Sequence, residues 1–308
     1  MLSKKFSIVV DLGCFLVVIV VNAFLALITP PFRRGFFCND DSIKYPYVKE
    51  EFLPTWTLLL VSVLLPVFTI IICEVGRQYQ KGQNTKREQY QNTNNSNVCG
   101  SWMKKPLFQR LFGTMSVFLY GSLINLLITL LGKTYSGELR PHFLAVCKPN
   151  MSLIDCNQGY ITNYECTGSN LDAIEKARRS FPSAHASLSM YGMLFLIVYF
   201  ESFIRNGGSF LKPFIQTGCF IVALLFGLSR VRDHMHHWHD VFAGFILGGF
   251  IAVYMGIRVL RLFDESHQTP KTGIVHRETL KSSMDNSEFN LHSPDRLIPT
   301  TPQFPVAL

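Results

Sequence analysis

Six stretches of mostly apolar residues constrain this sequence more than any other feature. They lie at about residues 7–29, 54–75, 110–131, 188–205, 213–229 and 240–262. An α-helix rises about 1.5 Å per residue, so stretches near 20 residues match the hydrocarbon thickness of about 30 Å. We therefore predict an all-α, polytopic membrane protein whose six transmembrane helices form one bundle.

The amino-acid composition supports this interpretation. Only 16% of the residues are charged and 48% are hydrophobic, whereas about a quarter are charged in an average soluble domain. The net charge of +8 raises the alternative of a nucleic-acid-binding protein. The basic residues form no continuous arm and no nucleic-acid motif accompanies them, so we expect the bilayer and anionic lipids, not nucleic acid, as partners.

The two ends of the chain differ in character. Lys4 and Lys5 precede a long apolar run without a small-residue cleavage site, which predicts a retained signal anchor. Residues 264–308 are rich in Ser, Thr, Pro and mixed charges, without a helical period. We predict a membrane domain at 1–263 and a disordered cytoplasmic tail at 264–308.

The distribution of basic residues predicts the orientation of the helices. An even number of crossings places both termini on one side, and clustered Lys and Arg mark that side as cytoplasmic. The cytoplasmic set is Lys4, Lys5, Arg77, Lys81, Lys86, Arg87, Lys104, Lys105, Arg110, Arg258 and Arg261. Basic residues also lie on the opposite side, and this exception indicates that they are kept there for a function.

Three clusters on the non-cytoplasmic side carry the residues suited to chemistry. They run from Lys133 to Pro141, from Ser180 to His185 and from Ser229 to Asp240. Their cations, Lys133, Arg140 and Arg230, can neutralise a phosphoryl group. Their histidines, His185 and His236, lie in a set with Asp240 and can supply a nucleophile and a proton donor. Pro182 predicts a helix start, where free N–H groups favour an anion.

A run of four histidines, His234, His236, His237 and His239, raises the alternative of a metal site. The sequence offers no carboxylate or cysteine elsewhere at ligand spacing to complete such a shell. We therefore predict no metal and no cofactor, and we expect His142, His234, His237 and His239 to be solvated loop residues.

The three clusters resemble the signature of the lipid phosphate phosphatases, members of the type 2 phosphatidate phosphatase superfamily related to vanadium haloperoxidases. That signature reads Lys-x6-Arg-Pro, Pro-Ser-Gly-His and Ser-Arg-x5-His-x3-Asp. Matching positions are Lys133, Arg140, Pro141, Pro182, Ser183, His185, Ser229, Arg230, His236 and Asp240. The resemblance extends over about residues 5–262, including a first loop similar to that of animal phospholipid phosphatases.

The resemblance implies six helices with an extracytoplasmic site, and a role for each residue. His236 would attack phosphorus to give a phosphohistidine, Asp240 would orient its ring, and His185 would protonate the leaving group and then activate water. The phosphoryl oxygens would be held by Lys133, Arg140, Ser183, Ala184 and Arg230. No metal takes part in that scheme.

Ala184 departs from the family pattern, which has glycine at this position. Alanine keeps the backbone N–H, so the change is mild if the local φ is negative. Because Pro182 suggests a helix start, we expect a negative φ and an active protein.

These observations predict a metal-independent phosphatase of phosphatidate, lysophosphatidate, sphingosine 1-phosphate or ceramide 1-phosphate. Two alternatives stay open: another enzyme on the same scaffold, such as a polyisoprenyl diphosphate phosphatase or lipid phosphotransferase, and a catalytically silent protein that binds lipid phosphate or partners. The preferred lipid and any homo-oligomeric state also stay open. The predicted location is the plasma membrane with an extracellular site, or a lumenal site in the secretory pathway.

Covalent modifications follow from the predicted orientation. Asn150 begins an Asn-Met-Ser glycosylation motif on the proposed outer face, whereas Asn94 begins the same kind of motif inside. Four cysteines, Cys38, Cys147, Cys156 and Cys166, would face an oxidising compartment. They allow three pairings, of which Cys147 with Cys156 closes the shortest plausible loop.

Overall fold

The computed structural model describes residues 4–91, 104–204 and 210–260. The predicted tail at 264–308 and the Asn94 motif lie outside the described residues. Where the chain is described it is mostly helical, and its one sheet has two short strands.

Six helical spans are long and apolar enough to cross a membrane, so the predicted all-α polytopic fold is confirmed. The second consists of α2 and α3 joined by a π-helical segment, Leu60–Leu64, and α9 continues into another, Tyr254–Val259. In chain order the helices that contribute are α1 (Lys4–Leu27), α2 (Thr55–Leu59), α3 (Leu65–Gln91), α4 (Lys104–Ser136), α7 (Ala184–Phe203), α8 (Leu211–Arg232) and α9 (Trp238–Val253).

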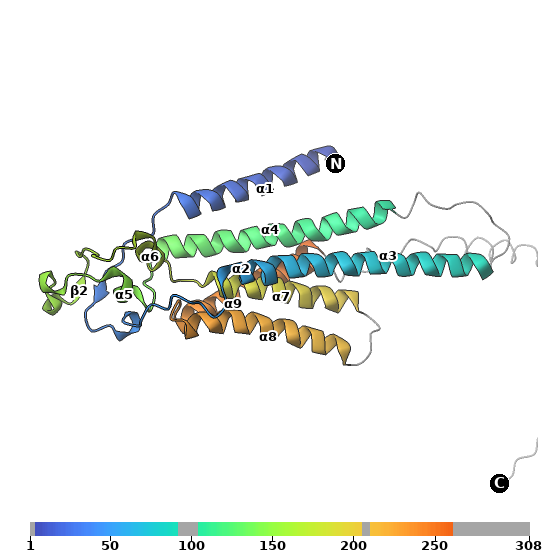
Figure 1. Ribbon diagram of the computed structural model, residues 1–308. Helices are drawn as coiled ribbons and strands as arrows, with labels where there is room; N and C mark the ends of the chain where they lie inside the picture. Colours follow the sequence, from blue (N-terminus) through green and yellow to red (C-terminus); the bar gives the residue numbers. More distant parts are fainter. Residues whose placement is uncertain (1–3, 92–103, 205–209, 261–308) are drawn as a thin grey trace, which may run out of the picture. The chain divides into compact units, whose positions relative to one another are not determined.

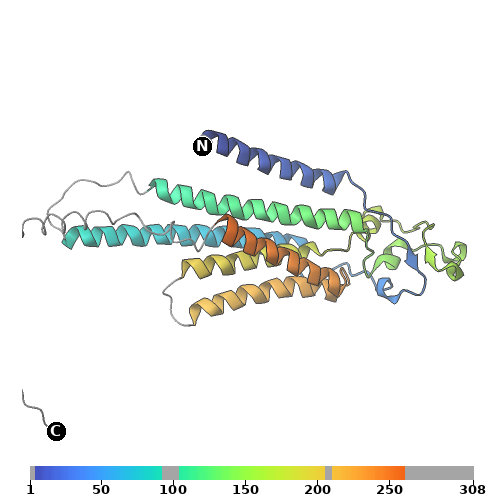
Figure 2. The same cartoon turned by 180° about the vertical axis from the view of Figure 1, so that it is seen from behind.

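Helix α7 is the centre of the bundle and α1 lies at its edge (Figures 1 and 2). α7 packs against α3, α4, α8 and α9, and 61% of its span is buried within the protein. α1 packs against α4, and only 17% of its span is buried. The helix that carries the Ser183 to His185 cluster is therefore the most constrained in the membrane domain.

Two glycines let α9 approach α7 closely. A Cβ at Gly244 would lie 2.7 Å from the carbonyl oxygen of Ser183, and one at Gly248 would collide with the carbonyl oxygen of Ser187. The sequence Gly244-x3-Gly248 thus packs inside the bundle, as small residues at helix interfaces in membranes commonly do. This close contact between the helices lies next to the first turns of α7 and α9, which carry His185 and Asp240.

We expect Gly248→Ala to destabilise the protein by about 1–3 kcal/mol, because the added methyl group meets backbone that cannot turn aside. The measurement is the thermal unfolding of purified protein in one detergent. Gly249→Ala is the matched control, since its Cβ would make only an ordinary contact, 3.4 Å from Leu194 Cδ2. Equal stability of the two variants would contradict the close packing.

The loops at one end of the bundle fold into a small layer of their own. It contains α5 (Phe143–Cys147), α6 (Leu171–Lys176) and an antiparallel pair of strands, β1 (Phe36–Phe37) and β2 (Tyr160–Ile161). Its apolar core is formed by Phe36, Ile43, Leu139, Phe143, Cys147 and Ala177. The layer joins the segment after α1 to the long segment between α4 and α7 (Figure 1).

Two disulfides connect these loops. The expectation that the loop cysteines are oxidised is confirmed, but the shortest pairing is wrong: Cys38 bonds to Cys156, and Cys147 bonds to Cys166. The two cysteines closest in the chain do not bond to each other. Strand pairing brings Phe37 opposite Tyr160 and so places Cys38 beside the turn that contains Cys156. Cys14, Cys73 and Cys219 are free thiols on the membrane helices.

Candidate active site

The structure brings the three clusters together at the loop end of the bundle, opposite the end where α1 begins (Figure 1). Lys133 lies in the last turn of α4 and Arg230 in the last turn of α8. His185 lies in the first turn of α7, Asp240 in the first turn of α9, and Arg140 and His236 in the preceding loops. Lys133, Arg230, His236 and Asp240 are all less than a tenth exposed.

Asp240 both caps the start of α9 and supports the ring of His236. Its Oδ2 accepts hydrogen bonds from Ser180 Oγ at 2.6 Å and from the backbone N–H of His237 at 2.8 Å. The second bond caps the helix. The same oxygen lies 3.6 Å from His236 Nδ1, and the Asp240 carbonyl accepts a bond from Ser183 N at 3.0 Å. One residue thus links the helix start, the histidine and the beginning of α7.

His236 is held as a neutral imidazole with one nitrogen turned toward Asp240. Burial and the charge of Lys133 hold the pKa of His236 well below its usual range, against the opposing effect of Asp240. Nδ1 faces Asp240 and lies 3.4 Å from Ser180 Oγ. The other ring nitrogen, Nε2, points away from that pair and carries the lone pair when Nδ1 is protonated.

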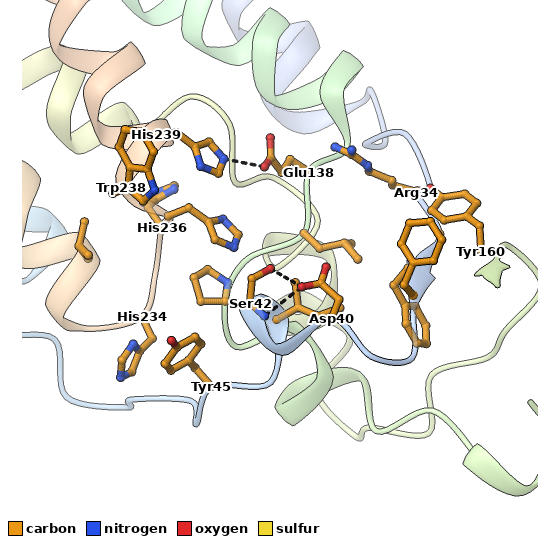
Figure 3. A pocket seen from close by; sticks show the side chains of 18 residues that line it. Arg34, Asp40, Ser42, Tyr45, Glu138, Tyr160, His234, His236, Trp238 and His239 are labelled. Atoms are coloured by element: carbon orange, nitrogen blue, oxygen red, sulfur yellow. Dashed lines mark hydrogen bonds and ion pairs between the residues drawn. The ribbon is translucent and has the colours of Figure 1, made fainter. Parts of the chain in front are cut away.

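The ring borders a pocket of about 640 Å³, lined mainly by residues of the loop layer (Figure 3). In that view His236 projects into the space between the loop before α9 and the segment around Asp40 and Ser42. The pocket gives a small molecule access to His236 from the loop side.

Two cations close to His236 remain available to an anion. Lys133 Nζ donates to the carbonyl oxygens of Arg179 and Ser180 at 2.9 and 3.2 Å. Arg140 Nε is buried without a hydrogen-bond partner, as is His185 Nε2. Burial lowers the pKa of Arg140 to about 10, so its guanidinium stays charged at neutral pH. Buried unpaired polar atoms are rare, and here they favour an anionic ligand.

Arg230 is engaged by the loop before α2, a contact that no sequence motif predicted. Its Nη1 donates to Glu51 at 2.9 Å, and its Nη2 donates to the carbonyl oxygen of Leu53 at 2.6 Å. Nε donates to Ser229 Oγ, which leaves two of the five guanidinium N–H groups without a hydrogen bond to these partners. The Glu51 carboxylate thereby holds the guanidinium group of Arg230 from one side.

Helix α7 begins at Ala184, two residues after the proline that predicted a helix start. Ser183 is its N-cap and accepts from Ala186 N at 3.5 Å, and Pro182, which is joined to Phe181 by a cis peptide bond, precedes the cap. Ala184 is the first helical residue. Positive φ at non-glycine positions occurs, within the described ranges, only at Lys148 and His234, so the expected negative φ at Ala184 is confirmed. The N–H groups of Ala184 and His185 have no acceptor within the helix.

We expect Ala184→Gly to change kcat by less than about tenfold, equivalent to about 1.4 kcal/mol, because alanine already has the required helical backbone and its N–H. The measurement is phosphate release under matched expression. An inactive parent protein that gains activity through this one substitution would show that Ala184 misplaces Ser183 and His185.

Three of the four histidines expected to be solvated have defined partners. His142 is buried, its Nδ1 lies 2.8 Å from the carbonyl oxygen of His234, and burial lowers the pKa of His142 to about 4. His239 Nε2 lies 2.8 Å from Glu138 Oε1, and His237 Nδ1 lies 3.4 Å from Asp240 Oδ2. The fold thus brings to His239 a carboxylate, Glu138, that lies 101 positions away in the sequence.

Comparison with known proteins now decides the family. The PAP2 superfamily model matches residues 114–262, the part that contains all three clusters. Phospholipid phosphatase 1 of Mus musculus is 37% identical over 258 residues, which cover 83% of this chain and 86% of that protein. The chain belongs to the lipid phosphate phosphatase family.

A second group of relatives has a different name. Phospholipid phosphatase-related protein type 1 of Homo sapiens is 36% identical over 244 residues, covering 77% of this chain and 74% of that protein. No solved structure matches.

Proposed function

We propose that this protein is a phosphatase of lipid phosphomonoesters that works through a phosphohistidine on His236. One observation carries the proposal: a buried neutral imidazole that borders a pocket has one ring nitrogen turned toward a carboxylate and lies close to Lys133 and to Arg140, whose Nε is buried without a hydrogen-bond partner. An imidazole placed in this way can attack phosphorus, while Lys133, Arg140 and Arg230 stabilise the charge on the phosphoryl oxygens.

In the first step, His236 Nε2 attacks phosphorus and the bond from phosphorus to the lipid oxygen breaks. His185 in its protonated form gives a proton to the departing alkoxide. In the second step the neutral His185 takes a proton from water, whose oxygen attacks the phosphohistidine and releases inorganic phosphate. Asp240 offsets the positive charge on the His236 ring throughout, as a carboxylate does for a catalytic histidine.

The substrate set we propose is phosphatidate, lysophosphatidate, sphingosine 1-phosphate and ceramide 1-phosphate. These molecules share a terminal phosphomonoester on an apolar anchor, which suits a site at the end of a membrane bundle. The test is phosphate release by purified full-length protein on this panel and on a polyisoprenyl diphosphate, with EDTA present. Binding of lipid phosphate without turnover would instead favour a silent protein, and product without free phosphate would favour a phosphotransferase.

We also propose that the site faces the extracellular or lumenal side and that both termini are cytoplasmic. Asn150 is an exposed loop residue whose side chain accepts a hydrogen bond from Ser152 Oγ, so the motif is accessible on the side of the active site. We expect a glycan at Asn150 and none at Asn94. A mass shift that is removed by Asn94→Gln and kept in Asn150→Gln would invert the orientation.

A further inference from the structure

Three side chains on the wall of the pocket, which have no role in the proposed reaction, converge with the buried carboxylate of Asp240. Glu138, from the segment after α4, lies beside His237, His239 and Asp240 from the start of α9. One donor atom from each lies within 4.8 Å of every other. Figure 3 shows His239 and Glu138 directed toward each other at the edge of the pocket, near His236.

The donors in this group are incompletely satisfied. Asp240 is fully buried, and its Oδ1 has no hydrogen-bond partner, although it lies 3.5 Å from His239 Nε2. His237 Nδ1 is also buried, and it makes no hydrogen bond to Asp240 Oδ2, which lies 3.4 Å away. Buried polar atoms without partners are unusual in native proteins, and two of them in one cluster of metal-ligating types point to a bound cation.

The type and spacing of the donors suit zinc. Two imidazoles and two carboxylates are ligands that Zn²⁺ takes in tetrahedral sites with bonds of about 2.0–2.2 Å, which place donor atoms about 3.4 Å apart. Contacts within the cluster run from 2.8 Å for His239 with Glu138 to 3.5 Å for His239 with Asp240. Magnesium and calcium prefer shells made of oxygen, so the imidazoles disfavour them.

We propose that Glu138, His237, His239 and Asp240 form a binding site for one Zn²⁺ ion, and that the bound ion inhibits the enzyme. Asp240 connects the two sites, because its carboxylate lies 3.5 Å from His239 Nε2 and 3.4 Å from His237 Nδ1, while its Oδ2 also accepts from Ser180 and lies 3.6 Å from His236 Nδ1. A dication on Oδ1 draws negative charge away from the carboxylate that must offset the charge developing on His236. The inhibitory part rests on the proposed function, whereas the binding part does not.

Zinc binding is tested first, without substrate. Purified full-length protein is stripped with EDTA, dialysed, and titrated with Zn²⁺ against a chromophoric chelator. We expect one equivalent to bind and the affinity to fall at least tenfold in Glu138→Gln and in His239→Gln. His234→Asn is the matched control, because it removes a histidine from the same pocket, His234 is not in the ligand set, and asparagine tolerates the positive φ there.

Phosphate release is then measured over a range of Zn²⁺ concentrations. We expect inhibition of the parent protein and of His234→Asn that EDTA reverses, and no inhibition by Mg²⁺ at the same concentrations. Glu138→Gln and His239→Gln should keep their activity in EDTA and need at least tenfold more Zn²⁺ for the same inhibition.

Equal zinc affinity in the parent and both ligand variants, or the absence of an equimolar site, overturns the proposed site. Zinc bound with the expected dependence but without effect on phosphate release overturns inhibition. A protein that binds zinc as expected yet releases no phosphate from any lipid phosphate in EDTA supports the site and refutes the proposed function.

Discussion

His236→Ala is expected to abolish phosphate release from every lipid phosphate, by a factor of about 10⁴ or more. The variant lacks the atom that forms the covalent bond, and removal of the nucleophile in comparable enzymes leaves only the contribution of transition-state binding. The ring of His236 makes no short hydrogen bond, since its Nδ1 lies 3.4 Å from Ser180 Oγ and 3.6 Å from Asp240 Oδ2. The fold should therefore tolerate the change.

Three measurements check this expectation together. They are steady-state phosphate release, capture of the phosphoenzyme after a quench in alkaline detergent, which preserves the P–N bond, and thermal unfolding in detergent. His234→Asn serves as the control, because it changes a histidine two residues away that lies outside the proposed reaction. Turnover by His236→Ala at the parent rate would exclude this histidine as the nucleophile.

Asp240→Asn should lower kcat by about 10²- to 10⁴-fold with little change in KM, because the side chain acts on the His236 ring and not on the lipid. Asparagine keeps one acceptor oxygen, so the bonds from Ser180 Oγ and His237 N can persist. What is lost is the negative charge that balances the phosphohistidine.

Asp240→Ala separates the two roles of this residue. It removes both the charge and the cap of α9, so it should lower stability by an additional amount of about 1 kcal/mol relative to Asp240→Asn. The measurements are kcat, KM and the thermal unfolding midpoint of all three proteins. A large change in KM with unaltered kcat in Asp240→Asn would place Asp240 in substrate binding instead.

The helices were predictable because the bilayer imposes their length. A span needs about 20 apolar residues wherever it lies in the chain, and this requirement is local. That the residues proposed for catalysis lie together was predictable for a related reason: His236 and Asp240 are four residues apart around the start of α9, and a family signature joins them to Lys133, Arg140 and His185.

The missed features depend on contacts between distant segments. Glu51 meets Arg230 across 179 positions, and Cys38 meets Cys156 across 118. Glu138 meets His239 across 101 positions. No periodicity or spacing connects such pairs, because the fold of the loop layer alone brings them together. For the same reason His142 was expected in solvent and is buried instead.

The contact of α9 with α7 governs the accuracy of the catalytic geometry. Each helix advances about 1.5 Å per residue, so a slip of one residue would shift Asp240 past His185 by more than the 1 Å that can lower a rate about a hundredfold. Such a slip is blocked, since the carbonyl oxygens of Ser183 and Ser187 lie against Gly244 and Gly248. The two helices are therefore held in a single register relative to each other. When a bilayer thickens or thins, we expect the pair to tilt as a unit, so that the distance between Asp240 and His185 is preserved.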